Sequence, residues 1–187
     1  MTDVIITQPK PFEEIKKMLK DFKKLIIIGC SDCASICQTG GSEQVKEMAE
    51  KLKDEHEILA TLMCQNPCDA RVVKSDIKFI EEELGKADAI LTMACGLGTQ
   101  DLAKVTGKKI IPANNTLFMG QVERLGRYYE LCCGCDNCVL FEHDCVCPVV
   151  IPKVCKDCGR LLAWDAEYCD KCGSQKLETG EAQKLEV

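Results

Sequence analysis

Apolar side chains near the start of the chain follow two periods in succession. Phe12, Ile15, Leu19 and Phe22 recur every three or four residues, which is the spacing of one face of an α-helix. The next apolar run, residues 25–28, is continuous and ends at a glycine, which is typical of a short strand buried on both faces. The pattern therefore predicts a helix followed by a buried strand.

The same unit recurs further along the chain, and Ser42 can cap its second helix. The predicted elements are a helix over 42–52, a strand over 58–63, a helix over 73–84, a strand over 89–93, a helix over 102–105 and a strand over 109–111. Strands that alternate with helices pair in parallel through right-handed crossovers. We therefore expect an α/β fold, namely a Rossmann-like parallel sheet with helices on both faces.

The character of the chain changes after residue 126. Residues 132–172 contain ten cysteines and few apolar runs, so a hydrophobic core alone cannot fold them and we expect metal to organise them. The predicted division is an α/β cluster-binding domain over 1–126, a ferredoxin-like iron–sulfur segment over 127–152, a zinc ribbon over 153–174 and a frayed polar tail over 175–187.

The composition decides between two uses of so many thiols. The 187 residues include 16 cysteines, which in a short chain indicates either a disulfide framework or metal sites. The first residues lack a basic segment followed by an unbroken apolar stretch, and no apolar run approaches the roughly 20 residues of a membrane span. We therefore expect a cytoplasmic protein without a membrane span, whose closely spaced thiols bind metal rather than form disulfides.

Charge, length and missing motifs exclude other classes. The formal net charge of -6 disfavours the binding of nucleic acid, and 187 residues are too few for a TIM barrel of roughly 250. Neither a dinucleotide fingerprint nor a P-loop follows any predicted strand. The two histidines support no nucleophilic triad, and His56 lies in a charged stretch that predicts solvated surface. We predict no catalytic residue.

The most specific metal motif is a pair of Cys-x-x-Cys sequences. Its four predicted ligands are Cys155, Cys158, Cys169 and Cys172. Each pair ends in a glycine that allows a tight turn, and four thiolates in a tetrahedron suit Zn²⁺. The motif predicts a structural zinc ribbon, and a rubredoxin-like iron site with the same ligands is the alternative.

A second cysteine run resembles that of bacterial ferredoxins. Its predicted ligands to a [4Fe–4S] cluster are Cys132, Cys135, Cys138 and Cys147, the last of which precedes a proline. Cys133 and Cys145 are then spare, and His143 is expected in a loop rather than as a ligand. The alternative is a second zinc site that uses four of these six thiols.

A third group of cysteines depends on the predicted sheet. Cys30, Cys64 and Cys95 each follow a strand, and the carboxyl ends of parallel strands form the edge where ligands bind. The same loops add Cys33, Cys37 and Cys68. We predict another [4Fe–4S] cluster, held by four thiols out of Cys30, Cys33, Cys37, Cys64 and Cys95, and we leave out Cys68, which follows a proline. Gly40, Gly41, Gly96 and Gly98 are expected to let the backbone approach this cluster. The alternative is that these are buried free cysteines that serve as small apolar residues.

Three motifs together resemble one family. They are Ile28-Gly29-Cys30-x-x-Cys33-x-x-x-Cys37-x-x-Gly40-Gly41, Met93-Ala94-Cys95-Gly96-x-Gly98, and Cys132-x-x-Cys135-x-x-Cys138-Val139 with Cys147-Pro148. Over residues 5–150 the chain is similar to the small iron–sulfur and zinc subunit, also found as a C-terminal domain, of methylenetetrahydrofolate reductase from anaerobic one-carbon metabolism, the Wood–Ljungdahl pathway. The two Cys-x-x-Cys pairs after Pro148 depart from that family's pattern.

The resemblance implies an electron-transfer subunit of an oxidoreductase. Its partner is then a separate flavin-containing catalytic subunit that reduces methylenetetrahydrofolate to methyltetrahydrofolate, with a further electron-donor subunit as a second partner. The chain is too short to hold a flavin barrel as well as three metal sites, which supports this division of labour. The alternative function is a zinc-stabilised assembly module without redox activity.

Overall fold

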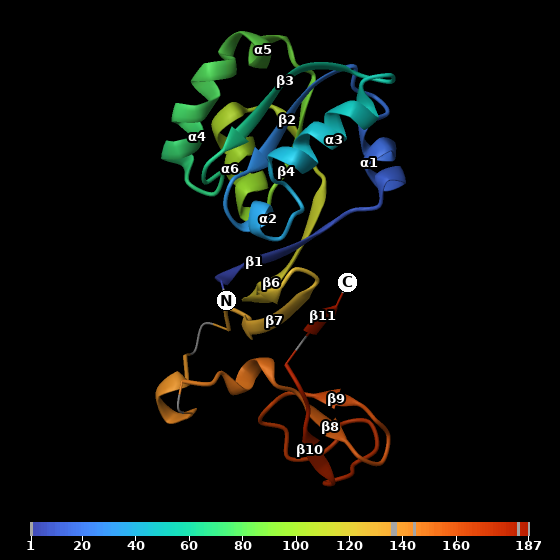
Figure 1. Ribbon diagram of the computed structural model, residues 1–187. Coiled ribbons are helices and arrows are strands. Elements are labelled where there is room, and N and C mark those ends of the chain that lie inside the picture. The colour runs from blue at the N-terminus through green and yellow to red at the C-terminus, as the bar shows by residue number, and fades with distance from the viewer. Residues whose placement is uncertain (1, 136–137, 144, 183, 187) are drawn as a thin grey trace. The chain divides into compact units, whose positions relative to one another are not determined.

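The computed structural model describes residues 2–135, 138–143, 145–182 and 184–186 (Figure 1). The chain forms two compact units. One comprises Ile5–Leu117, and the other comprises Met1–Val4 together with Phe118–Val187. Each unit is described by itself.

The unit Ile5–Leu117 contains a parallel sheet of four strands. These are β2 (Lys24–Cys30), β3 (Glu57–Cys64), β4 (Ala89–Met93) and β5 (Lys109–Pro112), and their order in the sheet is β3-β2-β4-β5. Every pair is parallel, so helices must connect the strands. The predicted α/β architecture with a parallel sheet is confirmed.

Helices cover both faces of this sheet (Figure 1). The elements are α1 (Phe12–Leu19), α2 (Cys33–Ile36), α3 (Ser42–Leu52), α4 (Ala70–Asp76), the 3₁₀ helix η1 (Ile77–Ile80), α5 (Glu81–Lys86) and α6 (Gly96–Thr106). Alternate residues of β2 serve different cores, because Leu25 and Ile27 pack with α1 and α3, whereas Ile26 and Ile28 pack with α4, η1 and α6. None of the helices in the described part of the chain is long and apolar enough to cross a membrane.

The helix predicted over 73–84 is broken into three pieces, namely α4, η1 and α5. The backbone of Ile80 leaves helical values, with φ -132° and ψ 26°, at the point where the last piece begins. This bend keeps Ile80 buried in the same core as Val73, while Phe79 is 81% exposed. The predicted apolar residues Val73, Ile77, Ile80 and Leu84 all pack in this core, but the helix that carries them is interrupted.

His56 is buried rather than on the solvated surface that the charged stretch predicted. Its Nδ1 lies 2.8 Å from the carbonyl oxygen of Phe22, to which it donates a hydrogen bond. The N–H of His56 also donates to the carbonyl of Leu52. The turn after α3 therefore folds the imidazole inward, and the neighbouring charged side chains remain outside.

A second sheet was not predicted from the sequence. It contains β1 (Thr2–Pro9), β6 (Asn114–Arg124), β7 (Arg127–Cys132) and β11 (Lys184–Glu186), in the order β1-β6-β7-β11. Residue 126, where the sequence suggested a domain boundary, is a glycine with φ 81° in the turn between β6 and β7. Its left-handed backbone allows the tight hairpin.

The unit that includes Phe118–Val187 also holds a small antiparallel sheet. It comprises β8 (Lys153–Cys155), β9 (Leu161–Leu162) and β10 (Leu177–Thr179), in the order β10-β8-β9, and the 3₁₀ helices η2 (Leu140–His143) and η3 (Pro148–Val150) precede it. The segment expected to be a frayed polar tail instead contains β10 and β11, which pair with β8 and β7. Backbone hydrogen bonds therefore order this polar sequence without a large apolar contribution.

Candidate metal centres

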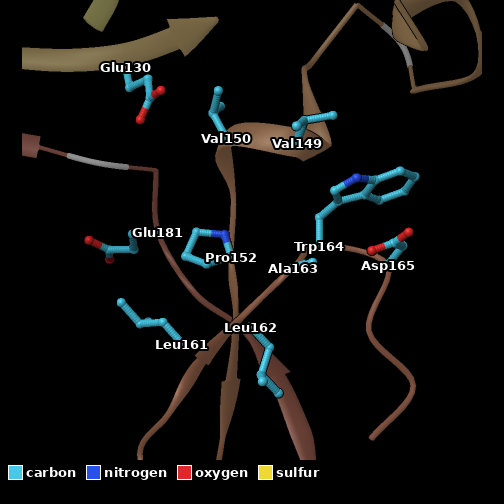
Figure 2. Close-up of a pocket in the computed structure, with 10 residues that line it drawn as sticks. All are labelled: Glu130, Val149, Val150, Pro152, Leu161, Leu162, Ala163, Trp164, Asp165 and Glu181. Carbon is cyan, nitrogen blue, oxygen red and sulfur yellow. The ribbon is translucent and has the colours of Figure 1, made fainter. Parts of the chain in front are cut away.

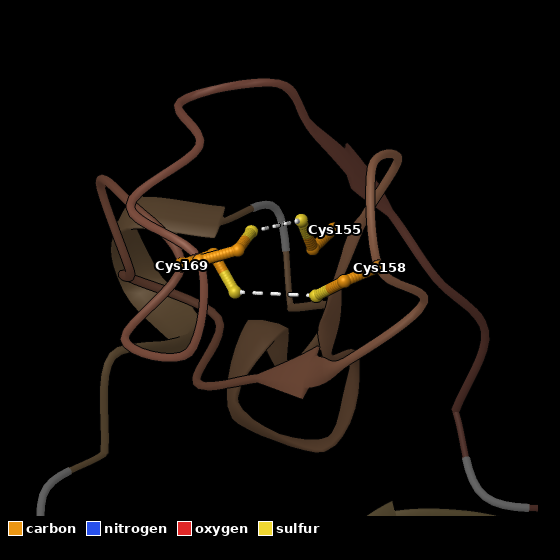
Figure 3. Close-up of side chains that lie close together, drawn as sticks. Cys155, Cys158 and Cys169 are labelled. Atoms are coloured by element: carbon orange, nitrogen blue, oxygen red, sulfur yellow. Dashed lines mark hydrogen bonds between the residues drawn. The ribbon is translucent and has the colours of Figure 1, made fainter.

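Four sulfur atoms come together in the antiparallel sheet and its turns. The sulfurs of Cys155, Cys158, Cys169 and Cys172 all lie within 4.8 Å of one another (Figure 3). The distance from Cys155 Sγ to Cys172 Sγ is 3.6 Å, and that from Cys158 Sγ to Cys169 Sγ is also 3.6 Å. Four ligands at 2.3 Å from one tetrahedral ion would be about 3.8 Å apart, so this group could hold a metal ion.

Two equivalent turns produce this arrangement. Gly159 and Gly173 have φ values of 70° and 73°, and each donates its N–H to the carbonyl of the first cysteine of its pair at 2.8 Å. Only a residue that tolerates left-handed backbone closes such a turn without strain. The sequence pattern Cys-x-x-Cys-Gly therefore encodes the turn as well as the ligands.

The protonation of these thiols is uneven. Burial opposes the thiolate of Cys169, but the N–H groups of Cys172 and Lys171 and the neighbouring thiols outweigh it and lower its pKa to about 7. The N–H of Ser174 favours the thiolate of Cys172, yet burial and the neighbouring sulfurs raise its pKa to about 12. The Cys169 thiol is thus ready to bind a cation near neutral pH, whereas the Cys172 thiol releases its proton only as the ion binds.

The four cysteines predicted to hold the second centre line one cavity. This cavity has a volume of about 210 Å³, and Cys132, Cys135, Cys138 and Cys147 belong to its lining together with apolar residues. Cys133 and Cys145, the two expected to be spare, do not line it. Gly134, with φ 67°, turns the chain between the first two of these ligands, and its N–H lies 3.4 Å from Cys132 Sγ.

These sulfurs are spaced differently from the first group. Among the residues that the structure describes, no three sulfurs of this run lie within 4.8 Å of one another. A single tetrahedral ion needs a shorter separation, whereas a cubane with iron at four corners holds its thiolates further apart. The sulfurs of this run are therefore less closely grouped than those of the tetrahedral group.

The third group lies at the carboxyl edge of the parallel sheet. Cys30 and Cys64 are register partners at the ends of β2 and β3, so they stand side by side on the same face. Cys95 lies two residues after the end of β4 and is the N-cap residue of α6. Cys33 is the first residue of α2. Cys30, Cys64 and Cys95 are buried, and Cys33 is half-buried.

These thiols influence one another electrostatically. Burial raises the pKa of Cys30, and a negative charge on Cys95 adds to the rise. Burial likewise raises the pKa of Cys33 to about 11, with contributions from Cys30 and Cys95, and that of Cys64 to about 12, with contributions from Asp76 and Cys30. Four thiols from different elements therefore share one partly buried neighbourhood.

Cys37 and Cys68 differ in their surroundings. The Cys37 thiol donates to the carbonyl of Ile5 at 3.8 Å, and its pKa is raised by burial without a contribution from another cysteine. The pKa of Cys68, which the sequence analysis left out, is raised by burial and then by the charge of Cys95. The exposed thiol of Cys68 is therefore a further candidate beside the five predicted ligands.

The sequence suggested that Gly40 lets the backbone approach a cluster, but in the structure Gly40 lies against the backbone of Met93. A Cβ atom at this position would lie 1.7 Å from the carbonyl oxygen of Met93, so the glycine allows a loop to pack directly on β4. Similarly, a Cβ on Gly98 would lie 3.0 Å from the ring of Pro67. Gly40 therefore allows close packing on the backbone of β4, and Gly98 allows close packing on the Pro67 ring.

Comparison of the chain with protein-family models, with curated proteins and with solved structures gave no match. The function must therefore be inferred from the placement of the cysteines in this fold. Fourteen of the sixteen free thiols belong to the tetrahedral group, the cysteine-lined cavity or the sheet edge with its loops. The other two are Cys133 and Cys145.

Proposed function

We propose that this chain is an iron–sulfur electron-transfer subunit of a cytoplasmic oxidoreductase, with two [4Fe–4S] clusters and one structural zinc ion. The observation that carries the proposal is the cavity lined by Cys132, Cys135, Cys138 and Cys147, from which the two other thiols of the run are absent. Four thiolates around one cavity, too far apart for a single ion, match the ligand set of a cubane cluster.

Several features of the chain suit one-electron transfer. Cys132, Cys135 and Cys138 are exposed, so a cluster that they hold lies near the protein surface, where electrons can pass to another protein. The N–H of Gly134 points at Cys132 Sγ, and hydrogen bonds to ligand sulfurs raise the reduction potential of a cluster. A bound cluster supplies the redox chemistry, while the protein residues hold it and tune its potential.

The tetrahedral group has a different role in this proposal. Zn²⁺ has a full d shell and carries no electrons, so Cys155, Cys158, Cys169 and Cys172 form a zinc ribbon that stabilises its own segment. The two tight turns close the site on all sides with protein ligands. A closed site of this kind contributes to folding rather than to chemistry.

We further propose that the partner is the flavin-containing subunit of a methylenetetrahydrofolate reductase, on the basis of the motifs at Cys30, Cys95 and Cys132. Each four-thiolate site with a doubly positive ion or core adds about -2, so the net charge of -6 becomes about -12 when three sites are filled. Such a charge favours a basic partner surface and disfavours the direct binding of an anionic folate. The folate and the flavin then belong to the partner.

A zinc-stabilised assembly module is the second candidate. One observation favours it. Within the described part of the chain, only the tetrahedral group has its sulfurs close enough together to bind a single ion. In this case the thiols at the sheet edge are buried apolar residues, and no electron passes through the chain.

Co-purification tests the proposed relay. The chain is produced under anaerobic conditions together with the flavoprotein, and we expect the two to purify as one complex that accepts electrons from an artificial donor. The matched control is a Cys135→Ser variant, which should still bind the partner but transfer electrons slowly. If the isolated chain bound flavin or reduced methylenetetrahydrofolate by itself, the proposal would be wrong.

A further inference from the structure

A cavity of about 630 Å³ lies within the unit that includes Phe118–Val187 (Figure 2). None of its ten lining residues is a cysteine, and the proposed relay function does not use it. Its volume falls within the range of about 300–1,000 Å³ that is usual for small-molecule sites. The cavity therefore has room for a ligand of its own.

Most of the cavity wall is apolar. Seven of the ten lining residues are aliphatic, proline or tryptophan, and they come from η3, β9 and the segments that follow each of these. Both Leu161 and Val150 belong to this wall, and Leu161 is 66% exposed whereas Val150 is buried. An apolar wall that remains open to water gains stability when a ligand with an apolar body covers it.

Trp164 is the aromatic element of the wall. The His143 ring meets it edge-on, with the ring centroids 5.7 Å apart and the ring planes at 86°, and this contact holds the indole in place. In Figure 2 the indole stands on the side of the cavity opposite to Glu130 and Glu181. An indole face attracts cations through its quadrupole, and tryptophan does so more strongly than other aromatic residues.

The three remaining lining residues are all carboxylates, namely Glu130, Asp165 and Glu181. Neither lysine nor arginine lines the cavity, and within the described ranges no ion pair forms with any of the three. Nearby acidic residues do have partners, since Glu178 pairs with Lys156 at 3.2 Å and Asp170 with Arg160 at 2.7 Å. Burial also raises the pKa of Glu130, so this carboxylate is partly dehydrated without a compensating charge.

We propose that this cavity binds a small organic cation, an alkylammonium or guanidinium compound with an apolar body. The carboxylates attract the charge, the indole and the aliphatic wall cover the body, and an anion is repelled by the same groups. A bare metal ion does not fit, because the three carboxylates do not form a group with ligand atoms within 4.8 Å of one another among the described residues.

Binding can be followed at the site itself, because Trp164 is the single tryptophan of the chain. The probes are hexylammonium and 1-hexanol, which share the same hydrocarbon body and differ in charge. With the full anaerobically purified chain, we expect hexylammonium to change the tryptophan fluorescence in a saturable way and to bind at least about tenfold more tightly than 1-hexanol in calorimetry.

Two variants locate the charge that is recognised. Partly exposed ion pairs are worth about 0.2–1 kcal/mol each, so Glu130→Gln and Glu181→Gln should each weaken hexylammonium binding up to about fivefold and leave 1-hexanol unaffected. Glu167→Gln is the matched control, because it removes an exposed carboxylate close in sequence that does not line the cavity, and it should have no effect. Equal binding of the two probes, no saturable signal, or equal weakening by the control would each overturn the proposal.

Discussion

The two units of this chain are stabilised by different means. All twelve of its largest fully buried side chains, such as Ile27, Leu91 and Leu102, lie between residues 6 and 102. After Leu117, the buried apolar residues of the described chain are Phe118, Tyr128, Val150, Cys155 and Cys169. Two of these five are cysteines of the tetrahedral group.

The difference shows what the cysteines do in each unit. In Ile5–Leu117 an aliphatic core forms the sheet, and the cysteines are a minor part of it, although Cys64 packs in the same core as Ile26 and Ile28. In the unit with Phe118–Val187 the described chain buries few apolar residues, so we expect an ion bound by the tetrahedral group to contribute to its folding. The tetrahedral group therefore supplies two of the few buried side chains of its own unit, whereas the thiols at the sheet edge are a small part of a large aliphatic core.

The largest effect should follow from removal of a zinc ligand. Structural zinc sites contribute about 10–16 kcal/mol of apparent binding energy, so Cys158→Ser should unfold β8, β9 and β10 and leave the parallel sheet intact. Hydrogen exchange together with zinc analysis measures both outcomes. Cys133→Ser, outside all three groups, is the control; zinc content unchanged by Cys158→Ser would break the comparison.

Removal of an aliphatic core residue should destabilise the unit Ile5–Leu117 and leave the zinc site unaffected. Ile27 of β2 is fully buried against the helices α1 and α3. Truncation of such a residue to alanine lowers the free energy of unfolding by about 2–5 kcal/mol. Ile27→Ala should therefore lower the denaturant midpoint of Ile5–Leu117, whereas zinc remains bound. Phe79→Ala, at an exposed position, should change the stability by less than about 0.5 kcal/mol.

The ligand set at the sheet edge is tested by three serine variants. Cys95→Ser should lower the iron content by about four atoms per chain, the number in one cubane cluster, with the sheet still folded. Cys68→Ser should also lower it, and Cys37→Ser should not, because the Cys37 thiol is engaged with Ile5. Iron analysis with circular dichroism gives the answer, and the reverse order of the last two variants would restore the ligand set expected from the sequence.

A smaller effect is expected at the buried imidazole. His56→Leu keeps the apolar volume and removes the hydrogen bond to the Phe22 carbonyl, which should cost about 1 kcal/mol. Thermal unfolding of the full chain measures this loss. A variant as stable as the original protein would show that the hydrogen bond from His56 to Phe22 does not stabilise the fold.

Much of the parallel sheet could be predicted, because its strands are continuous apolar runs between amphipathic helices. The β6–β7 hairpin could not, since its first residue, Asn114, is polar and yet buried. The Asn114 amide donates to the carbonyl of Thr39 at 3.2 Å, and Thr39 shares a hydrogen bond of 2.6 Å with Thr7. Hydrogen bonds of this kind join buried polar residues across long sequence separations, and no local period reveals them.

The candidate sites show a similar division. The two Cys-x-x-Cys-Gly turns are local, so the spacing alone predicts their four ligands. The role of Cys68 depends on how the loop after β3 returns toward Cys95, which is a property of the tertiary fold. The register of Cys30 with Cys64 follows from strand pairing, and the sequence could predict it once both strands were identified.

The central claim, that the chain carries electrons through clusters, is tested most directly by the visible absorption of the anaerobically purified full chain before and after dithionite. The account predicts a broad band near roughly 400 nm that dithionite bleaches, with about eight iron atoms and one zinc per chain. A colourless protein that contains zinc alone would contradict it and leave the assembly module as the function.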